Sequence, residues 1–584
     1  MNKTNKTKII ATLGPGIKSK EKIVELIRAG MNVARINLSH GERDSHAEFI
    51  ELVKQARDIA GTYSAILLDT RGPEIRVGDL QEPLMLEIGA TLIITAGQAN
   101  LSENRINVNY PGLIDDVQPG NRILLDDGKL ALQVAHITDG EVYTTILVGG
   151  KLSSRKRVSL PDCDVNLPSL TEQDQLDIAF GVSQEVDFIA ASFVRKAEDV
   201  WAVRKILDEN GGRQAIIAKI ESRQGVENLA EILEAADGLM VARGDLGVEM
   251  PAEEVPVIQK KIIHAANLVG KPVITATQML ESMITSPTPT RAEASDVTNA
   301  IYDGTDAVML SAETAVGAYP LEAIRFLVRC ATITERSLDY DAMLAAGVRH
   351  KRQTITDSIS YACCATAADL GAAAIITSTT SGSTARMVAR HRPKAPIIAV
   401  SPSLESLRKL QLIRGVTTIF SDCSTTMDEQ LDKSIAAAQQ AGFIDNGDLV
   451  VVTAGMPIGT TGSTNMLKVR TVEDVCYTGQ GTGGNIAEGK IHVLEKELDW
   501  RDLPQDAIAV VTSTNDAMRD HLRHVRGIIA EEPGLTSHAA IVGRELNIPV
   551  ICNVLHATTI FKNGQTVTID GTAGHISYGS ASTR

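Results

Sequence analysis

The sequence predicts an α/β protein whose largest part is a (β/α)₈ barrel, or TIM barrel, and three observations support this. In the first half of the chain, short apolar segments rich in β-branched residues alternate with longer helical ones, which is typical of a parallel sheet buried on both faces. Residues 1–70 and 169–340 together approach the roughly 250 residues of such a barrel. Polar side chains follow nearly every expected strand, at the end of a barrel where active sites lie. The eight expected strands are Lys8–Leu13, Asn32–Leu38, Ser64–Asp69, Asp187–Phe193, Ala215–Glu221, Gly238–Arg243, Lys271–Thr277 and Asp306–Glu313.

The length and composition describe a large, acidic globular protein. The chain has 584 residues, and at about 150 residues per domain this predicts roughly four domains. Hydrophobic residues make up 43% and charged residues 22%, which excludes an intrinsically disordered protein. Aromatic residues make up only 3% and the net charge is −15, so nucleic-acid and anionic-membrane partners are disfavoured. A phosphorylated substrate therefore needs a locally basic pocket.

The cysteines and the apolar segments indicate a cytoplasmic protein. The seven cysteines are spread along the chain without a Cys-x-x-Cys pair, so free thiols in a reducing compartment are expected rather than a zinc ribbon. The N-terminal sequence MNKTNKTKIIATLG contains no apolar run of signal-peptide length. No stretch approaches 18 uninterrupted apolar residues, so we expect no membrane span.

Three further domains are expected around the barrel. Residues 71–168 show strand alternation and turn signals, which predicts a small all-β domain inserted after the third barrel strand and acting as a lid. Residues 341–474 resume the strand and helix alternation as a separate α/β unit. A Gly-rich stretch at 478–485 lies near the start of an expected fourth domain, residues 475–584.

The polar residues at the strand ends suggest a site for an anion. Arg35 and Lys219 can hold a phosphoryl group or a carboxylate. Glu221 and Asp245 supply hard oxygen ligands that suit Mg²⁺. The backbone N–H groups around Gly244 open a helix and could bind a carboxylate. Any one of these residues could be a solvated strand end or a helix cap, but their recurrence at six strand ends favours a Mg²⁺-dependent site for a small phosphorylated or carboxylated metabolite.

A second group of oxygen-bearing side chains suits a monovalent cation, because it offers neutral oxygens with one charge. Strand periodicity places Arg35, Asn37 and Ser39 on one face. The four residues of this group are Asn37, Ser39, Asp69 and Thr70.

At these residues the sequence resembles the pyruvate kinases, over essentially residues 1–475. The matching stretches are GMNVARINLSHG (30–41), LLDTRGPEIRVG (67–78), AKIESRQGVEN (218–228), MVARGDLGVE (240–249), ATQMLESMITSPTPTRAEASDV (276–297) and DAVMLSAETAVGAYP (306–320). The resemblance implies transfer of the phosphoryl group of phosphoenolpyruvate to ADP, giving pyruvate and ATP in the last step of glycolysis. It also implies a homotetramer under the control of a phosphorylated allosteric effector.

The resemblance assigns the residues of the reaction centre. Arg35 and Lys219 would contact the phosphoryl group, and Glu221 and Asp245 would hold Mg²⁺ or Mn²⁺. The metal and Lys219 would neutralise the charge of the phosphoryl group in transfer.

The resemblance also assigns the residues around the rest of the substrate. The amides of Gly244 and Asp245, with Thr277, would hold the substrate carboxylate. Ser311 and Glu313 match positions linked, with Thr277, to protonation of the enolate, and the identity of the proton donor stays open.

Potassium and nucleotide sites follow from the same resemblance. A glutamate at the position of Glu74 accompanies K⁺ dependence in this family. The implied K⁺ ligands are Asn37, Ser39, Asp69 and Thr70. The residues implied to approach the nucleotide are His40, Arg76 and Lys156.

A loop in the third domain is the expected effector-phosphate site. Hydroxyl groups and a glycine precede a helix that starts near Ala385, which suits a phosphate; a Ser/Thr-capped loop is the alternative. Residues 455–465 could form the opposite wall. The loop residues are Ser378, Thr379, Thr380, Ser381, Gly382, Ser383 and Thr384.

The last domain resembles the mobile, swivelling phosphohistidine domain of phosphoenolpyruvate-utilising enzymes such as pyruvate phosphate dikinase. The resemblance centres on His538 in EPGLTSHAAIVG (532–543). Pro533 and Gly534 stand where that family usually has two glycines, and no ATP-grasp partner domain is evident. We therefore expect a structural or regulatory role for His538 rather than phosphotransfer.

Two other functions remain open on the residues alone. A barrel lyase or aldolase acting on pyruvate through Mg²⁺ would also use carboxylates and arginine at strand ends, but it would not need the lid. A metabolite-sensing scaffold without catalysis would predict a broken site, whereas Lys219, Glu221 and Asp245 are all present.

Overall fold

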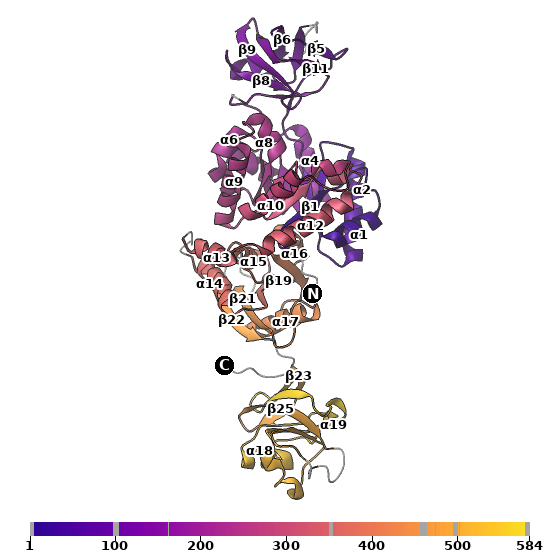
Figure 1. Cartoon of the computed structure of the whole chain (residues 1–584), viewed down its shortest axis with the longest axis vertical. Helices are drawn as coiled ribbons and strands as arrows, with labels where there is room; N and C mark the ends of the chain where they lie inside the picture. Colours follow the sequence, from indigo (N-terminus) through magenta and orange to yellow (C-terminus); the bar gives the residue numbers. More distant parts are fainter. Residues whose placement is uncertain are drawn as a thin grey trace. The chain divides into compact units, whose positions relative to one another are not determined.

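In the computed structural model, the described residues form four bodies: a closed barrel, an inserted segment with two sheets, a body with a five-stranded sheet and a body with an eight-stranded sheet. Figure 1 shows their elements. The described residues within 1–368, 375–434 and 453–467 form one compact unit, and those within 369–374, 435–452 and 468–584 form another. No helix among the described residues is both long enough and apolar enough to cross a lipid bilayer. The residues that the structure describes are 5–96, 104–161, 163–349, 354–424, 426–455, 464–472, 475–494, 500 and 503–578.

The first body is a closed eight-stranded parallel barrel, in the order β1-β17-β16-β15-β14-β13-β3-β2, so the predicted fold class is confirmed. Its interior is filled by large apolar side chains such as Leu67, Ile217 and Met240. Each expected strand matches an observed one, and the observed strands are shorter because the polar end residues turn out of the barrel. The strands are β1 Lys8–Thr12, β2 Val33–Asn37, β3 Ala65–Asp69, β13 Phe188–Ala191, β14 Ala215–Ile220, β15 Gly238–Ala242, β16 Val273–Ala276 and β17 Ala307–Leu310.

Helices follow the barrel strands and bury their apolar faces on the sheet. Local sequence fixes where several of them begin and end. Thr171 and Thr290 form capping boxes with Asp174 and Glu293, and α10 ends at Gly304, whose φ of 98° favours glycine. The helices are α1 Lys20–Ala29, α2 Arg43–Ala60, α4 Glu172–Ser183, α5 Ala197–Glu209, α6 Arg223–Glu227, α7 Leu229–Ala235, α8 Arg243–Glu249, α9 Val255–Val269, α10 Arg291–Asp303, α11 Ala312–Ala315 and α12 Pro320–Arg336, with the 3₁₀ turn η1 Glu281–Ile284.

The inserted segment between β3 and β13 is almost entirely β-structure. Its seven-stranded sheet runs β4-β12-β8-β9-β10-β6-β7, a second sheet pairs β11 with β5, and one short helix, α3 (Leu113–Asp116), lies among them. Alternate residues such as Leu92, Ile94, Ile106 and Val108 form its own core. The strands are β4 Ile75–Arg76, β5 Leu84–Leu86, β6 Thr91–Ala96, β7 Arg105–Val108, β8 Arg122–Leu125, β9 Leu130–Thr138, β10 Glu141–Val148, β11 Gly150–Leu152 and β12 Arg157–Ser159.

The third body is a five-stranded sheet in the order β20-β19-β18-β21-β22, and β18, β19 and β20 pair in parallel. Its strands are β18 Ala374–Ser378, β19 Ile397–Ser401, β20 Val416–Phe420, β21 Leu449–Gly455 and β22 Thr464–Thr471. The helices of this part of the sequence are α13 Tyr340–Arg349, α14 Ile355–Asp369, α15 Ser383–Ala389, α16 Leu404–Lys409 and α17 Met427–Gln440, with the 3₁₀ turn η2 Leu410–Leu412.

The last body is an eight-stranded sheet in the order β23-β30-β29-β25-β26-β27-β28-β24, with a core that includes Ile508, Val510 and Ile551. The exact boundaries of the four expected domains stay predictions. The strands are β23 Val475–Thr478, β24 Gln480–Thr482, β25 Ile486–Val493, β26 Ile508–Val511, β27 Gly527–Ala530, β28 Val550–Cys552, β29 Thr566–Asp570 and β30 His575–Tyr578. Its described residues also include the helices α18 His538–Leu546 and α19 Ala557–Ile560 and the 3₁₀ turns η4 Asp516–Met518 and η5 Leu522–His524.

Candidate active site

The candidate site lies at the C-terminal end of the barrel strands. Strands β2 and β3 pair so that Asn37 lies opposite Asp69. Lys219 is the penultimate residue of β14, and Glu221 follows that strand directly. Asp245 lies in the first turn of α8, which follows β15. Because parallel strands end at one rim, residues far apart in the sequence meet here.

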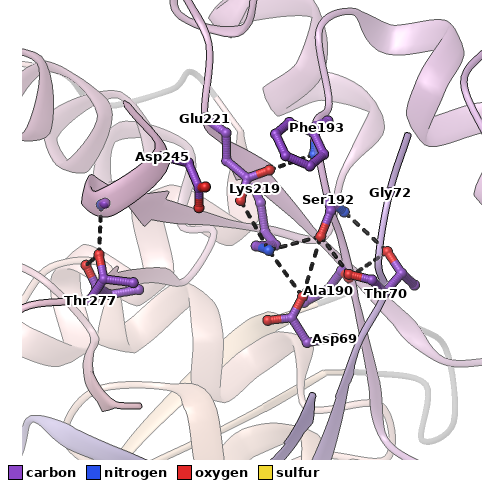
Figure 2. A network of polar contacts seen from close by, with 12 residues as sticks. Asp69, Thr70, Gly72, Ala190, Ser192, Phe193, Lys219, Glu221, Asp245 and Thr277 are labelled. Atoms are coloured by element: carbon purple, nitrogen blue, oxygen red, sulfur yellow. Dashed lines mark hydrogen bonds and ion pairs between the residues drawn. The ribbon is translucent and has the colours of Figure 1, made fainter. Parts of the chain in front are cut away.

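Lys219 is the centre of a buried network of polar contacts (Figure 2). Its Nζ lies 3.1 Å from Asp69 Oδ1 and 3.0 Å from Glu221 Oε1, and it donates a hydrogen bond of 2.8 Å to Ser192 Oγ. Only 11% of the Lys219 side chain is exposed, and 1% of each carboxylate side chain. The ammonium group is therefore held in one position, away from bulk water.

Arg35 shares the same carboxylate. Its Nε donates to Asp69 Oδ2 at 2.7 Å, and one terminal nitrogen donates to Thr12 Oγ1 at 2.9 Å. Asp69 thus joins Arg35 and Lys219, which the sequence assigned to one anion. Such charge-assisted hydrogen bonds fix the direction in which both cations point.

The charges of Lys219 and Asp69 stabilise each other, whereas the charge of Glu221 is disfavoured. Burial disfavours the ammonium of Lys219, but Asp69 and Glu221 outweigh it and raise the pKa of Lys219. Burial also disfavours the Asp69 carboxylate, but Lys219 and Arg35 outweigh it and lower the pKa of Asp69. The pKa of Glu221 is raised, because burial and the nearby charge of Asp245 outweigh Lys219. Lys219 therefore keeps its positive charge at neutral pH.

Arg157, an arginine of the inserted β-structure that the sequence did not single out, reaches this rim. Arg157 on β12 forms an ion pair with Asp245, and its guanidinium carbon lies 4.8 Å from the ring centroid of Phe193. The side chain is 11% exposed. The predicted metal ligand Asp245 is therefore engaged by a cation of the chain itself.

The oxygen atoms around Glu221 and Asp245 fit a divalent cation. Glu221 Oε2 accepts a hydrogen bond of 2.6 Å from the Phe193 amide, whereas the buried Oε1 accepts none from the described residues and has Lys219 as its ion-pair partner. The described residues hold no group of three or more His, Cys, Asp or Glu side chains arranged to bind a metal. Two carboxylates completed by substrate or water oxygens match the preference of Mg²⁺.

Thr277 closes the next part of the rim in an unusual backbone conformation. Its φ of 63° and that of Gln278, 55°, are left-handed, which is rare for a β-branched residue. Thr277 Oγ1 accepts a hydrogen bond of 2.8 Å from the Gly244 amide, one of the groups predicted to hold a carboxylate. Arg243 donates to the Thr277 carbonyl at 2.6 Å and pairs with Asp296 at 2.7 Å, so the strained turn is tied to α8 and α10.

Ser311 and Glu313 differ in the atoms they leave free. The Glu313 carboxylate accepts hydrogen bonds from the amides of Ser311 at 2.7 Å and Leu280 at 3.1 Å, and the residue is 2% exposed. Ser311 Oγ is buried without a hydrogen-bond partner among the described residues. Glu313 thus positions the turn, and the Ser311 hydroxyl keeps its hydrogen-bonding capacity.

The residues assigned to K⁺ lie on neighbouring strand ends but make different contacts. Asn37 Oδ1 accepts from the Ser39 amide at 3.1 Å. Thr70 Oγ1 donates to the Ala190 carbonyl at 3.3 Å. Asp69 pairs with Arg35 and Lys219, so it connects the residues predicted to bind K⁺ with those predicted to bind the anion.

The residues assigned to the nucleotide come from two places. His40 is exposed after β2. Arg76 on β4 donates to Glu74 Oε2 and to the Arg155 carbonyl, both at 2.8 Å. Lys156, just before β12, pairs with Asp126 Oδ1 at 2.7 Å. Strand β4 pairs with β12, which places Arg76 opposite Arg157, the residue that follows Lys156.

The predicted effector loop joins β18 to α15. Thr379 Oγ1 accepts from the Gly382 amide at 3.0 Å, and Gly382 has a φ of 78° at the start of α15. Thr464 Oγ1 donates to Thr384 Oγ1 at 2.9 Å. Most of the predicted opposite wall, residues 456–463, lies outside the described residues.

His538 begins α18 with its ring held on both nitrogens. Nδ1 lies 2.8 Å from Thr514 Oγ1, and Nε2 lies 3.2 Å from Asp516 Oδ1. Ser537 caps the helix by accepting from the Ala540 amide at 3.3 Å. Helix α18 therefore begins at His538 itself, directly after its cap.

Comparison with known families divides the chain into three matches. Residues 4–324 match the family described as "Pyruvate kinase, barrel domain", and residues 357–470 match "Pyruvate kinase, alpha/beta domain". Residues 503–574 match "PEP-utilising enzyme, mobile domain".

Curated relatives match along their whole length. The chain is 50% identical over 582 residues to the pyruvate kinase of Geobacillus stearothermophilus, covering 99% of each chain. It is 46% identical to that of Bacillus licheniformis and 44% identical to that of Sporosarcina psychrophila, again over 582 residues and 99% of each chain.

Proposed function

The chain belongs to the pyruvate kinase family and is a phosphotransferase, and from this premise we propose that it transfers the phosphoryl group of phosphoenolpyruvate to ADP, giving pyruvate and ATP in the last step of glycolysis. The observation that carries the proposal is the buried Lys219 ammonium, fixed between Asp69 and Glu221 at the barrel rim. A fixed cation there can stabilise the negative charge of a phosphoryl group in transfer, which is the main task in this reaction.

The rim residues bind and orient the substrate. Arg35 and Lys219 contact the phosphoryl group. The amides of Gly244 and Asp245, with the Thr277 hydroxyl, hold the carboxylate. The Gly244 amide exchanges its hydrogen bond to Thr277 for one to the substrate.

Glu221 and Asp245 hold Mg²⁺ or Mn²⁺ in this proposal. When bound, the ion neutralises charge on the phosphoryl and substrate oxygens. Arg157 then has to leave Asp245, because the guanidinium and the ion compete for one carboxylate.

Phosphoryl transfer leaves the enolate of pyruvate, and formation of pyruvate needs a proton at its methylene carbon. Thr277 and the Ser311 hydroxyl can hold a water molecule that delivers it, and Glu313 keeps Ser311 in place. The inserted β-structure acts as a lid that excludes water, which would otherwise compete with ADP.

The remaining assignments are also proposals. Arg76 and Lys156, with His40, approach the nucleotide. The enzyme is a cytoplasmic homotetramer regulated through the third domain, with domains at 1–70 with 169–340, 71–168, 341–474 and 475–584. The K⁺ ligands are Asn37, Ser39, Asp69 and Thr70. The loop that holds the effector phosphate is Ser378, Thr379, Thr380, Ser381, Gly382, Ser383 and Thr384.

A coupled assay tests the proposal. We expect ATP to form from phosphoenolpyruvate and ADP only when Mg²⁺ or Mn²⁺ is added. The rate should be higher with K⁺ than in buffer that contains neither K⁺ nor Na⁺. Pyruvate formation without ATP, or none from phosphoenolpyruvate, would contradict it.

A further inference from the structure

A cavity of about 380 Å³ lies at the opposite end of the barrel from the candidate active site. Its walls include the starts of β13 and β14 and the residues just before β15 and β16, together with parts of α15, α16 and η2. Its volume lies in the range of small-molecule sites. It shares no lining residue with the rim site described above.

Four cations line the cavity. They are Arg204, Arg213, Arg386 and Lys409, and the one acidic residue among the lining residues is Asp237. The protein as a whole carries a net charge of −15. The cavity is therefore a locally positive spot on an acidic molecule, and such a spot concentrates small anions.

Two of these cations already have partners. Arg204 pairs with Asp237 Oδ2 at 2.6 Å and donates to the Gln214 carbonyl at 3.0 Å. Lys409 pairs with Glu405 at 2.6 Å and donates to the Arg213 carbonyl at 2.5 Å. These contacts hold the walls of the cavity in place.

The other two cations have no such partners. The guanidinium groups of Arg213 and Arg386 make neither a hydrogen bond nor an ion pair with any described residue. Arg213 is exposed, but Arg386 is partly buried. Burial lowers the pKa of Arg386, and the charge of Asp237 only partly offsets this. Guanidinium stays charged in proteins, so Arg386 carries a charge at a cavity wall that no directly bonded partner compensates.

The remaining lining residues indicate which kind of ligand fits the cavity. Phe188, Ile217, Pro272 and Leu410 supply apolar surface opposite the arginines. The guanidinium fork matches the paired oxygens of phosphate. An anion with a carbon skeleton therefore fits the cavity better than an inorganic ion, which would leave the apolar surface uncovered.

We propose that this basic cavity is a second binding site, which takes a small organic phosphate on the arginines Arg213 and Arg386. The site is separate from phosphoryl transfer and stands whether or not the proposed function is right. It is also distinct from the loop residues 378–384, although Ser381 of that loop lies at its edge.

Titration calorimetry on the full-length protein, with phosphoenolpyruvate and ADP both left out, tests the site. The probes are glycerol 3-phosphate, glucose 6-phosphate and uridine monophosphate, with inorganic phosphate for comparison. We expect at least one organic phosphate to bind more tightly than inorganic phosphate. Absence of binding by all three organic probes at millimolar concentration would overturn the proposal.

Variants locate the binding. Arg386→Gln should weaken the Kd of that probe about tenfold or more, which corresponds to about 1.4 kcal/mol. Arg28→Gln, at an exposed arginine of α1, should change it less than twofold. Thr380→Ala removes a hydroxyl group of the loop without adding charge and should change it little. Loss of binding in Thr380→Ala with retention in Arg386→Gln would place the ligand in the loop and refute the cavity site.

A stability readout separates loss of a ligand contact from misfolding. Because Arg386 has no described partner, Arg386→Gln should not lower the Tm of the free protein. A Tm lower by several degrees would show that the charge is structural and would contradict the inference.

Discussion

The cationic side chains at the two ends of the barrel differ in whether carboxylates compensate their charge. At the C-terminal rim, Lys219 and Arg35 meet the buried carboxylates of Asp69 and Glu221. At the other end, Arg386 is partly buried, and its guanidinium makes no ion pair or hydrogen bond with the described residues. The compensated rim is organised before any ligand arrives, as catalysis requires. At the cavity, the guanidinium of Arg386 gains a direct partner only when an anion binds.

The largest test of this contrast is Lys219→Met. Removing a charge contact that matters most in the transition state should lower kcat about 10³-fold and leave phosphoenolpyruvate binding nearly unchanged. Steady-state rates and a separate binding titration on the folded variant measure both effects. Lys205→Met, at a lysine 74% exposed on α5, is the matched control. A fall in kcat of less than about tenfold would show that Lys219 is not the phosphoryl stabiliser.

Glu74→Lys tests the monovalent cation. The family resemblance links a glutamate here to K⁺ dependence, and a lysine would supply the positive charge from the chain. We expect the ratio of the activity with K⁺ to the activity without K⁺ to fall about tenfold or more. A change of this size is expected for one well-placed charge interaction. Rates across a K⁺ series in Tris buffer measure it.

Glu74 also accepts a hydrogen bond from Arg76, so its replacement frees that arginine. Glu74→Gln keeps the shape without adding charge and serves as the control. Full wild-type activity in buffer free of K⁺ and Na⁺ would contradict the K⁺ assignment itself.

Arg157→Gln asks whether the compensation at the rim extends to the metal ligand. Without the guanidinium, Asp245 is free for a divalent ion, so the Kd for Mn²⁺ should tighten about threefold to tenfold, as expected for loss of a partly screened charge. Binding of Mn²⁺ without substrates, followed by electron paramagnetic resonance, measures it. Arg155→Gln removes the neighbouring exposed arginine, which pairs with Asp79, and should leave the Kd unchanged. Weaker Mn²⁺ binding in Arg157→Gln would instead show that Arg157 positions Asp245 for the metal.

The smallest effect is expected at His538. Its ring is held by Thr514 and Asp516, and the residues assigned to catalysis all precede it by more than two hundred positions. His538→Ala should therefore change kcat less than twofold, in a steady-state assay beside wild type. Incorporation of phosphate at His538 from labelled phosphoenolpyruvate would overturn the structural reading and indicate phosphotransfer through the last domain.

Much of the fold and of the rim follows from local sequence. The eight apolar segments predict the barrel because buried parallel strands have few other compositions. Asp69, Lys219 and Glu221 were each expected at this rim from the strand ends, although Asp69 was assigned to a separate group for a monovalent cation. The signal is strong because a closed barrel forces the strand ends onto one ring.

Residues brought in by packing between distant segments escaped prediction. Ser192 and Thr12 belong to the two expected strands whose ends were not singled out, although Ser192 is the polar residue near the end of DFIAASF. Arg157 stands beside Lys156 in a short basic run, and nothing local says that it turns to Asp245. The basic cavity joins Arg204 to Arg386, which are far apart in the sequence, so only the folded chain reveals it.

Thr277 carries a consequence for attempts to make this protein more heat resistant. Its left-handed backbone at a φ of 63° costs roughly 1–3 kcal/mol, which glycine would not incur. A selection that scored only survival at high temperature would therefore favour glycine at this position. The surviving proteins would lack the hydroxyl that accepts a hydrogen bond from Gly244. Laboratory evolution for heat resistance would therefore lower turnover by replacing a strained residue of the active site.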